Sequence, residues 1–109
     1  MTQKPVTERC VSMLKALADE TRWRIVRELL QQTLTVNEIT ERVEISQYNV
    51  SKHLRILREA GIVQARKQGK QVHCRVATSF LKRLSRSKNV LDLGCCTFRF
   101  DRLPKSPCN

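Results

Sequence analysis

The sequence predicts a mainly α-helical protein with a small β-hairpin and a short, strand-like C-terminal arm, on three observations. Up to about residue 60, apolar residues recur at the three- and four-residue spacing of amphipathic helices. From residue 62 to residue 76 they alternate instead, on both sides of a glycine, as in a hairpin. From residue 90 to residue 100 they alternate again, around two adjacent cysteines. The 109 residues suffice for one domain with a modest core.

The first three helices are predicted from their apolar stripes and caps. Residues 6–18 have helical spacing, with Cys10 on the apolar face. Asp19 can cap a second helix, because its carboxylate can accept a hydrogen bond from an amide that the first turn leaves unpaired. Thr35 and Glu38 have the spacing of a capping box, in which each side chain bonds the other residue's backbone amide. We expect a short third helix to begin there.

A fourth helix and a hairpin follow. Ser46 can cap a helix that runs to about residue 60 and stops at Gly61. Residues 62–67 and 71–76 are predicted strands with a glycine in the turn between them, and a short helix is expected at about residues 78–86. Two short helices joined by a tight turn and followed by a hairpin are the arrangement of a winged helix-turn-helix.

The fourth helix is predicted to have two different faces. At about 100° per residue, Val50, Leu54 and Leu57 fall in one narrow arc that must face the core. The rest of the surface carries an aromatic ring, amides, hydroxyls and cations, which suit the reading of base edges and the binding of phosphates. The candidate DNA-binding residues of this helix are Ser46, Gln47, Tyr48, Asn49, Ser51, Lys52, His53 and Arg55. The candidate cations at the hairpin tip, where a wing would meet the DNA backbone, are Arg66, Lys67 and Lys70.

Each of these features has a plainer alternative. Glu59 lies on the same helix face as the cations, and three cations at a loop tip can simply be solvated. His53 falls on the flank of the helix, which suits a structural or phosphate-contacting histidine rather than a metal ligand. The helix and the hairpin together, one after the other, favour DNA binding more than either does alone.

The overall charge favours a polyanionic partner. Lys and Arg outnumber Asp and Glu by 21 to 10, a formal charge of +11, which points to nucleic acid first and a membrane surface second. No apolar run reaches the ~20 residues of a membrane span, and the first residues lack a secretory leader. We therefore expect a cytoplasmic protein whose partner is double-stranded DNA and not a membrane.

Two other functional classes fit the sequence less well. We expect no enzymatic activity, because no GxGxxG, P-loop or HExxH pattern is present and strand alternation sends His73 and Cys74 to opposite faces. A DNA-compacting or RNA-binding protein would show little sequence preference, since contacts to phosphates do not read the bases.

The helix-turn-helix region resembles one family of repressors. The matching segments are ALADETRWRIVRELL, TVNEITERVEISQYNVSKHLRILREAGIV and RKQGKQVHCRV. They cover roughly residues 10–77 and resemble the ArsR-type repressors, which respond to arsenicals and metals. The resemblance implies a homodimer, joined through its first and last helices, that releases its operator when an inducer binds. Two recognition helices about one turn of DNA apart, ~34–36 Å, would read a palindrome.

The five cysteines raise the question of the inducer. Cys10 and Cys74 lie on apolar faces, which favours reduced thiols in the core. Cys95, Cys96 and Cys108 are the smallest set that can form a three-thiolate site for As(III), Sb(III) or another soft ion. Some ArsR-type relatives similarly combine two adjacent cysteines with a third. Thiol redox sensing and cysteines with no sensing role are the alternatives, and Cys10 or Cys74 could join the site.

The sequence departs from the family pattern at several positions, and these departures limit which ligand residues of the family can be assigned to this chain. The alternation of residues 90–100 changes phase between the adjacent cysteines, and a bulge or kink beside Gly94 would correct it and could turn both thiols to one side. Thr35 and Asn37 stand where arsenical sensors have their usual cysteine pair. The last predicted helix lacks His and carboxylate ligands, so zinc, nickel or cobalt sensing is not expected there.

These expectations divide the chain in two. Residues 1–88 are the predicted DNA-binding and dimerisation domain, and residues 89–109 are the cysteine-containing arm. No metal ion is expected to be needed for folding.

Overall fold

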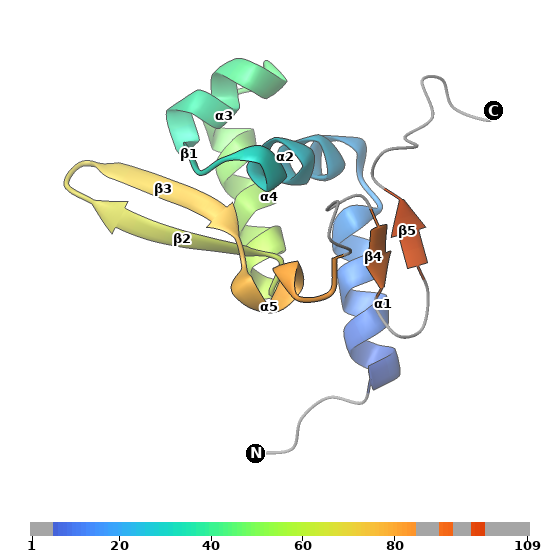
Figure 1. The fold of residues 1–109 in the computed structure, drawn as a ribbon. Helices are drawn as coiled ribbons and strands as arrows, with labels where there is room; N and C mark the ends of the chain where they lie inside the picture. Colours follow the sequence, from blue (N-terminus) through green and yellow to red (C-terminus); the bar gives the residue numbers. More distant parts are fainter. Residues whose placement is uncertain (1–5, 85–89, 93–96, 100–109) are drawn as a thin grey trace.

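A computed structural model describes residues 6–84, 90–92 and 97–99 of the chain (Figure 1). Its elements are α1 (Val6–Leu17), α2 (Glu20–Gln31), β1 (Leu34–Thr35), α3 (Val36–Val43), α4 (Gln47–Glu59), β2 (Val63–Gln68), β3 (Gln71–Val76), α5 (Thr78–Leu81), β4 (Val90–Asp92) and β5 (Thr97–Arg99). The hairpin of β2 and β3 extends away from the helices, and β4 and β5 lie at the opposite end of the molecule (Figure 1). The arrangement is a winged helix-turn-helix, as predicted.

The predicted caps begin three of the helices. The Asp19 carboxylate accepts a hydrogen bond of 3.0 Å from the Arg22 amide at the start of α2. Both bonds of the capping box of α3 are present, with the Thr35 amide donating to Glu38 at 2.9 Å and the Glu38 amide donating to Thr35 at 3.2 Å. The Ser46 hydroxyl accepts from the Asn49 amide at 3.2 Å at the start of α4. Each cap satisfies an amide that has no partner within its own helix.

The wing is part of a three-stranded antiparallel sheet with the strand order β1-β3-β2. Strands β2 and β3 pair from Val63 opposite Val76 to Gln68 opposite Gln71, and Gly69 adopts a positive φ of 62° in the two-residue turn. The pairing of Leu34 with Cys74 adds β1, a strand of 2 residues that the sequence pattern did not predict.

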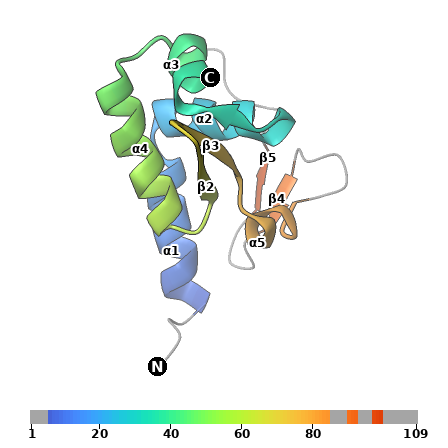
Figure 2. The same cartoon turned by 90° about the vertical axis from the view of Figure 1, so that its left-hand side faces the viewer.

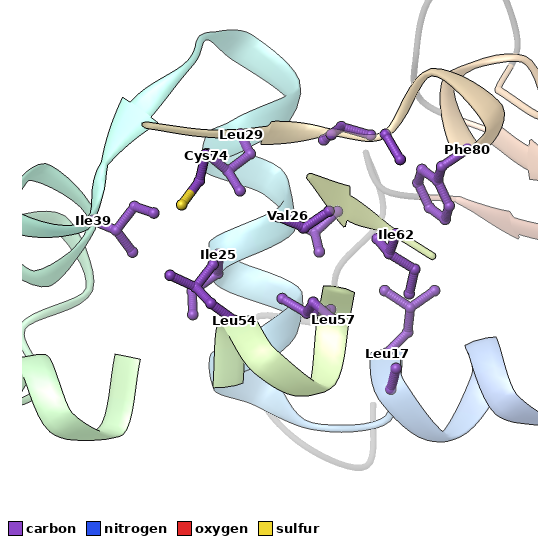
Figure 3. Packing of buried hydrophobic residues seen from close by; sticks show 14 of the residues in the cluster. Leu17, Ile25, Val26, Leu29, Ile39, Leu54, Leu57, Ile62, Cys74 and Phe80 are labelled. Atoms are coloured by element: carbon purple, nitrogen blue, oxygen red, sulfur yellow. The ribbon is translucent and has the colours of Figure 1, made fainter. Parts of the chain in front are cut away.

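The core lies between α2, α4 and one face of the sheet (Figure 3). Ile25 of α2, Leu57 of α4 and Cys74 of β3 are fully buried, each with a relative exposure of 0%. Cys74 is therefore a core residue, as predicted, and burial raises the pKa of its thiol. Leu91 of β4 is buried in the same cluster, which ties the arm to the domain.

Ile62 joins α4 to the wing. Its amide donates to the carbonyl of Leu57 in the last turns of α4 at 2.9 Å. Its carbonyl accepts from the amide of Ala77, directly after β3, at 2.8 Å. The end of α4 and the base of the hairpin are thus fixed to each other through one residue.

The predicted helix at residues 78–86 is too long. Helix α5 ends at Leu81, and residues 82 and 83 form a turn. The Arg83 carbonyl accepts a hydrogen bond of 2.9 Å from the amide of Asp92, and Leu84 forms a β-bridge with Leu91. The backbone groups of Arg83 and Leu84 therefore bond to β4 and do not form a further turn of α5.

The bulge or kink predicted beside Gly94 lies outside the described residues. Strands β4 and β5 pair antiparallel, from Val90 opposite Arg99 to Asp92 opposite Thr97. The proposed metal ligands Cys95, Cys96 and Cys108 lie outside the described residues.

Candidate nucleic-acid interface

Helix α4 separates its core residues from its polar residues as predicted. Val50, Leu54 and Leu57 have relative exposures of 0%, 4% and 0%, and they pack into the core. The opposite side is open to solvent along its length. Its exposed members are Gln47, Tyr48, Asn49, Ser51, Lys52 and Arg55. In Figure 2, α4 lies beside the hairpin, and α4 contacts β2.

The exposed side of α4 is more cationic near its N-terminus. The Lys52 ammonium lies 5.4 Å from the centre of the Tyr48 ring, a cation–π distance, and Tyr48 is 72% exposed. Arg55 is paired at 3.0 Å with Glu59, one turn further along. The Glu59 carboxylate therefore offsets the charge of Arg55 in the free protein, whereas the first two turns carry no acidic residue. These first turns are the part of a recognition helix that enters the major groove.

A polar hollow of about 190 Å³ joins α4 to the wing and to α3. Gln47 and Ser51 contribute from α4, Lys70 from the hairpin turn, Gln71 from the start of β3, and Asn37 from α3. Its amide, hydroxyl and ammonium groups can donate to phosphate oxygens or to base edges. The sequence patterns did not indicate Asn37 or Gln71, because only the fold brings them to Gln47.

The three predicted wing cations do not lie together. Lys70 lines the hollow beside α4. Arg66 pairs with His73 across the hairpin and shares its face, while Lys67 pairs with Val72 and shares the face of Cys74. All three cations are exposed, but alternation along β2 puts Arg66 and Lys67 on opposite sides of the wing.

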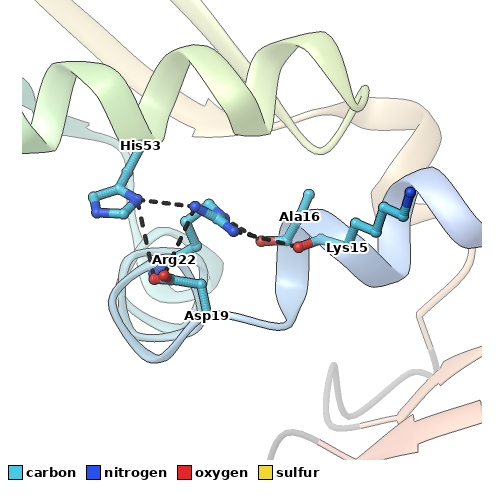
Figure 4. Close-up of polar contacts among 5 residues, drawn as sticks. All are labelled: Lys15, Ala16, Asp19, Arg22 and His53. Atoms are coloured by element: carbon cyan, nitrogen blue, oxygen red, sulfur yellow. Dashed lines mark hydrogen bonds and ion pairs between the residues drawn. The ribbon is translucent and has the colours of Figure 1, made fainter.

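His53 belongs to a network that connects α4 to the junction of α1 and α2 (Figure 4). The Arg22 guanidinium lies 3.2 Å from the His53 Nδ1 and also donates to the backbone carbonyls of Ala16 and Lys15. Since a guanidinium only donates, Nδ1 is the acceptor in this contact. The Asp19 carboxylate completes the network, 3.8 Å from Arg22 and 4.0 Å from His53. This geometry favours the structural interpretation of His53.

The same network affects Asp19. Burial alone would raise the pKa of the Asp19 carboxyl, but the hydrogen bond from the Arg22 amide and the charge of Arg22 outweigh it. The pKa is therefore lowered, and Asp19 stays ionised well below neutral pH.

The described residues contain no nucleophile–base pair, no metal site and no membrane-spanning helix. Cys74 is buried and His73 lies on the other face of β3, so the two cannot act as a nucleophile and its base. Within residues 6–84, 90–92 and 97–99, no group of three or more His, Cys, Asp or Glu side chains could hold a metal ion. In the same ranges, no helix is long and apolar enough to cross a membrane.

The known proteins that this chain is similar to include bacterial transcriptional regulators. The model of the family described as bacterial regulatory protein, arsR family, matches residues 19–65. The transcriptional activator HlyU of Vibrio cholerae is 38% identical over 74 residues, which are 68% of this chain and 68% of HlyU. The arsenical resistance operon repressor of Escherichia coli is 43% identical over 68 residues, 62% of this chain and 58% of that protein.

Solved structures are similar over most of the chain. A structure of V. cholerae HlyU has a TM-score of 0.67 at 35% identity, covering 73% of this chain and 87% of that one. A structure described as a homodimeric winged helix-turn-helix DNA-binding domain from Mycobacterium bovis has a TM-score of 0.65 at 25% identity, covering 72% of this chain and 78% of that one.

Proposed function

The chain belongs to the ArsR family of bacterial regulatory proteins, and on that premise we propose that it is a transcriptional repressor that binds a palindromic operator as a homodimer. The observation that carries the proposal is the exposed side of α4, whose first turns lie beside Lys70 of the wing. In this proposal Gln47, Tyr48 and Asn49 enter the major groove, and Ser46, Ser51, Lys52 and Lys70 hold the phosphates.

An apolar surface on α1 and α2 supports the homodimer. Leu14, Leu17, Ala18 and Trp23 line a hollow of about 270 Å³, and Val11 on the same helix as Leu14 is 42% exposed. Apolar surface of this kind is commonly covered by a partner subunit. A symmetric dimer would place its two copies of α4 at the spacing of consecutive major grooves, ~34–36 Å.

We further propose that a thiophilic inducer, As(III), Sb(III) or another soft ion, releases the protein from DNA by binding Cys95, Cys96 and Cys108. The name of the E. coli repressor, which associates it with arsenical resistance, supports this choice of inducer. Positive charge close to a thiol favours the thiolate form that soft ions require, and the sequence of the arm itself carries Arg99, Arg102 and Lys105. For the inducer to release the DNA, it must bind the DNA-free state of the protein more tightly than the DNA-bound state. A coupling free energy of ~1–3 kcal/mol between the inducer site and the DNA site would change operator affinity ~5–150-fold.

The DNA-binding part is tested with duplexes selected from a random pool by the full-length chain. We expect a palindromic selected duplex to bind at least about 10³-fold more tightly than random DNA, measured by fluorescence anisotropy at two salt concentrations. Equal binding to every duplex would refute a sequence-specific repressor and favour a DNA-compacting protein.

The inducer is tested by titrating As(III), Sb(III), Cd(II) and Zn(II) into the protein–DNA complex. We expect As(III) or Sb(III) to release the DNA from the wild type but not from the C95S/C96S variant. C74V is the matched control, because Cys74 is buried in the core and its replacement should leave release unchanged. Release by peroxide, reversed by a dithiol, would favour the alternative of thiol redox sensing.

A further inference from the structure

The network of Asp19, Arg22 and His53 lies between α4 and the apolar surface of α1 and α2. The Arg22 guanidinium is held by the Ala16 and Lys15 carbonyls of α1, and it reaches the His53 ring of α4 at 3.2 Å. The same end of α1 lines the apolar hollow of about 270 Å³ that a partner subunit would cover in the proposed dimer. One guanidinium therefore connects α4 to the surface that would join the two protomers.

The network has two alternative arrangements that differ by one proton. The His53 Nδ1 lies 3.2 Å from the Arg22 guanidinium and 4.0 Å from the Asp19 carboxylate. In the neutral ring Nδ1 accepts from Arg22, so the ring proton is on Nε2. In the protonated ring both nitrogens donate, so Nδ1 is attracted to Asp19 and repelled by Arg22. The side chains of His53 and Arg22 are 22% and 14% exposed, so solvent screens this change less than it would on the open surface.

Asp19 keeps its charge while a histidine titrates. Burial raises the pKa of the Asp19 carboxyl, but the hydrogen bond from the Arg22 amide and the Arg22 charge hold that pKa below its ordinary value. Other charges near α4 lie in solvent: the charged side chains of α3, α4 and β2 are exposed, and so is Lys15 of α1. Figure 4 shows the Lys15 side chain extending away from the His53 ring. Asp19 and Arg22 are thus the charged groups that the structure places against His53.

We propose that Asp19 and Arg22 position α4 through His53, and that protonation of His53 releases α4 and weakens binding to the palindrome. This inference rests on the proposed function and adds a proton-linked control to it. A palindrome needs two copies of α4 at one fixed spacing, ~34–36 Å, so a change in the orientation of α4 relative to the dimer surface lowers the affinity. A single half-site has no such requirement. Because the DNA-bound form keeps the neutral ring, DNA and protons oppose each other's binding.

The test measures DNA affinity of the full-length chain at pH 7.5 and pH 5.5 by fluorescence anisotropy, at constant ionic strength and with a reductant. This range covers the protonation of an imidazole, and His53 and His73 are the 2 histidines of the chain. The wild type should bind the selected palindrome at least about 5-fold more weakly at pH 5.5, while its affinity for a duplex with one half-site changes little. H53N should bind the palindrome equally at both pH values, because the asparagine oxygen can accept from Arg22 and does not titrate.

The matched control is H73N, which removes the other histidine, on the wing. It should keep the pH dependence of the wild type, and urea midpoints at both pH values check that each protein is folded. Nitrogen NMR of the ring gives a readout that does not depend on DNA. In the free wild type at pH 7.5 the His53 proton should be on Nε2, and R22A should remove this preference.

Three results would overturn the inference. The first is a wild-type affinity for the palindrome that is equal at both pH values, which needs no variant. The second is an equal loss of affinity at pH 5.5 in H53N and the wild type. The third is tighter binding of the wild type to every duplex at pH 5.5, absent in H53N, which would assign His53 to a direct phosphate contact. Failure of the wild type to prefer the palindrome over random DNA at pH 7.5 would instead refute the proposed function.

Discussion

Replacing Arg22 with alanine should lower the free energy of unfolding by about 2–4 kcal/mol. The Arg22 side chain is 14% exposed and donates to the Ala16 carbonyl, the Lys15 carbonyl and the His53 ring. The two carbonyls belong to the last turn of α1, where helical partners are lacking. Hydrogen bonds that involve a charged group contribute about 1.5–3 kcal/mol each, and bonds that share one guanidinium are not additive.

The assay is urea unfolding at pH 7 and fixed protein concentration, with the midpoint and the slope both fitted. R22K is the matched control, because it keeps the charge and loses the fork of donors, and its stability should fall between those of R22A and the wild type. The Asp19 cap is retained in both variants, since it accepts from the backbone amide of residue 22.

A double-mutant cycle separates the contact with His53 from the rest. R22A and H53A together should be less destabilising than the sum of the two changes, with a coupling of about 1 kcal/mol. An R22A variant within about 0.5 kcal/mol of the wild type would refute the view that the network joins α4 to α1 and α2.

Three further predictions concern single sites. The pKa values of Asp19 and Glu38 are lowered in the folded state, so these carboxylates stabilise the fold above their ordinary values of 3.8 and 4.5, and this stabilisation is lost as the pH falls through the folded pKa. The urea midpoint should therefore drop less between pH 7 and pH 3 in D19N and E38Q than in the wild type, and equal drops would contradict the assignment. K52Q should weaken DNA binding on all sequences and reduce the salt slope by about 0.9 per protomer, and an unchanged slope would exclude a phosphate contact. Cys74 is buried and burial raises its pKa, so iodoacetamide should label it only after urea unfolding, as read by peptide mass; rapid labelling of the native protein would show that the core opens at β3.

Local signals predicted the helices well. The caps at Asp19, Thr35 and Ser46 depend on residues within three positions of each other, so their hydrogen bonds follow from the local sequence. The buried arc of α4 likewise follows from helical periodicity, because Val50, Leu54 and Leu57 lie within two turns.

Local sequence patterns could not predict the contacts between segments that are distant in the sequence. The pairing of Leu34 with Cys74 and of Leu84 with Leu91 depends on where the fold places two segments, and it creates β1 and shortens α5. The contact of Arg22 with His53 spans 31 positions, and only the structure brings the two together. Alternation alone separates Arg66 from Lys67, but which of them shares the face of Cys74 depends on the pairing of β2 with β3, and β2 starts one residue later than predicted.

The junction at Ile62 has a consequence for how such regulators diversify. The end of α4 and the base of the wing are fixed by backbone hydrogen bonds and buried side chains, and none of these involves Gln47, Tyr48 or Asn49. Substitutions on the exposed side of α4 can therefore accumulate without disturbing the frame that orients it. After a gene duplication, a copy could acquire preference for a new operator through a few such changes while its folding stability stayed almost constant.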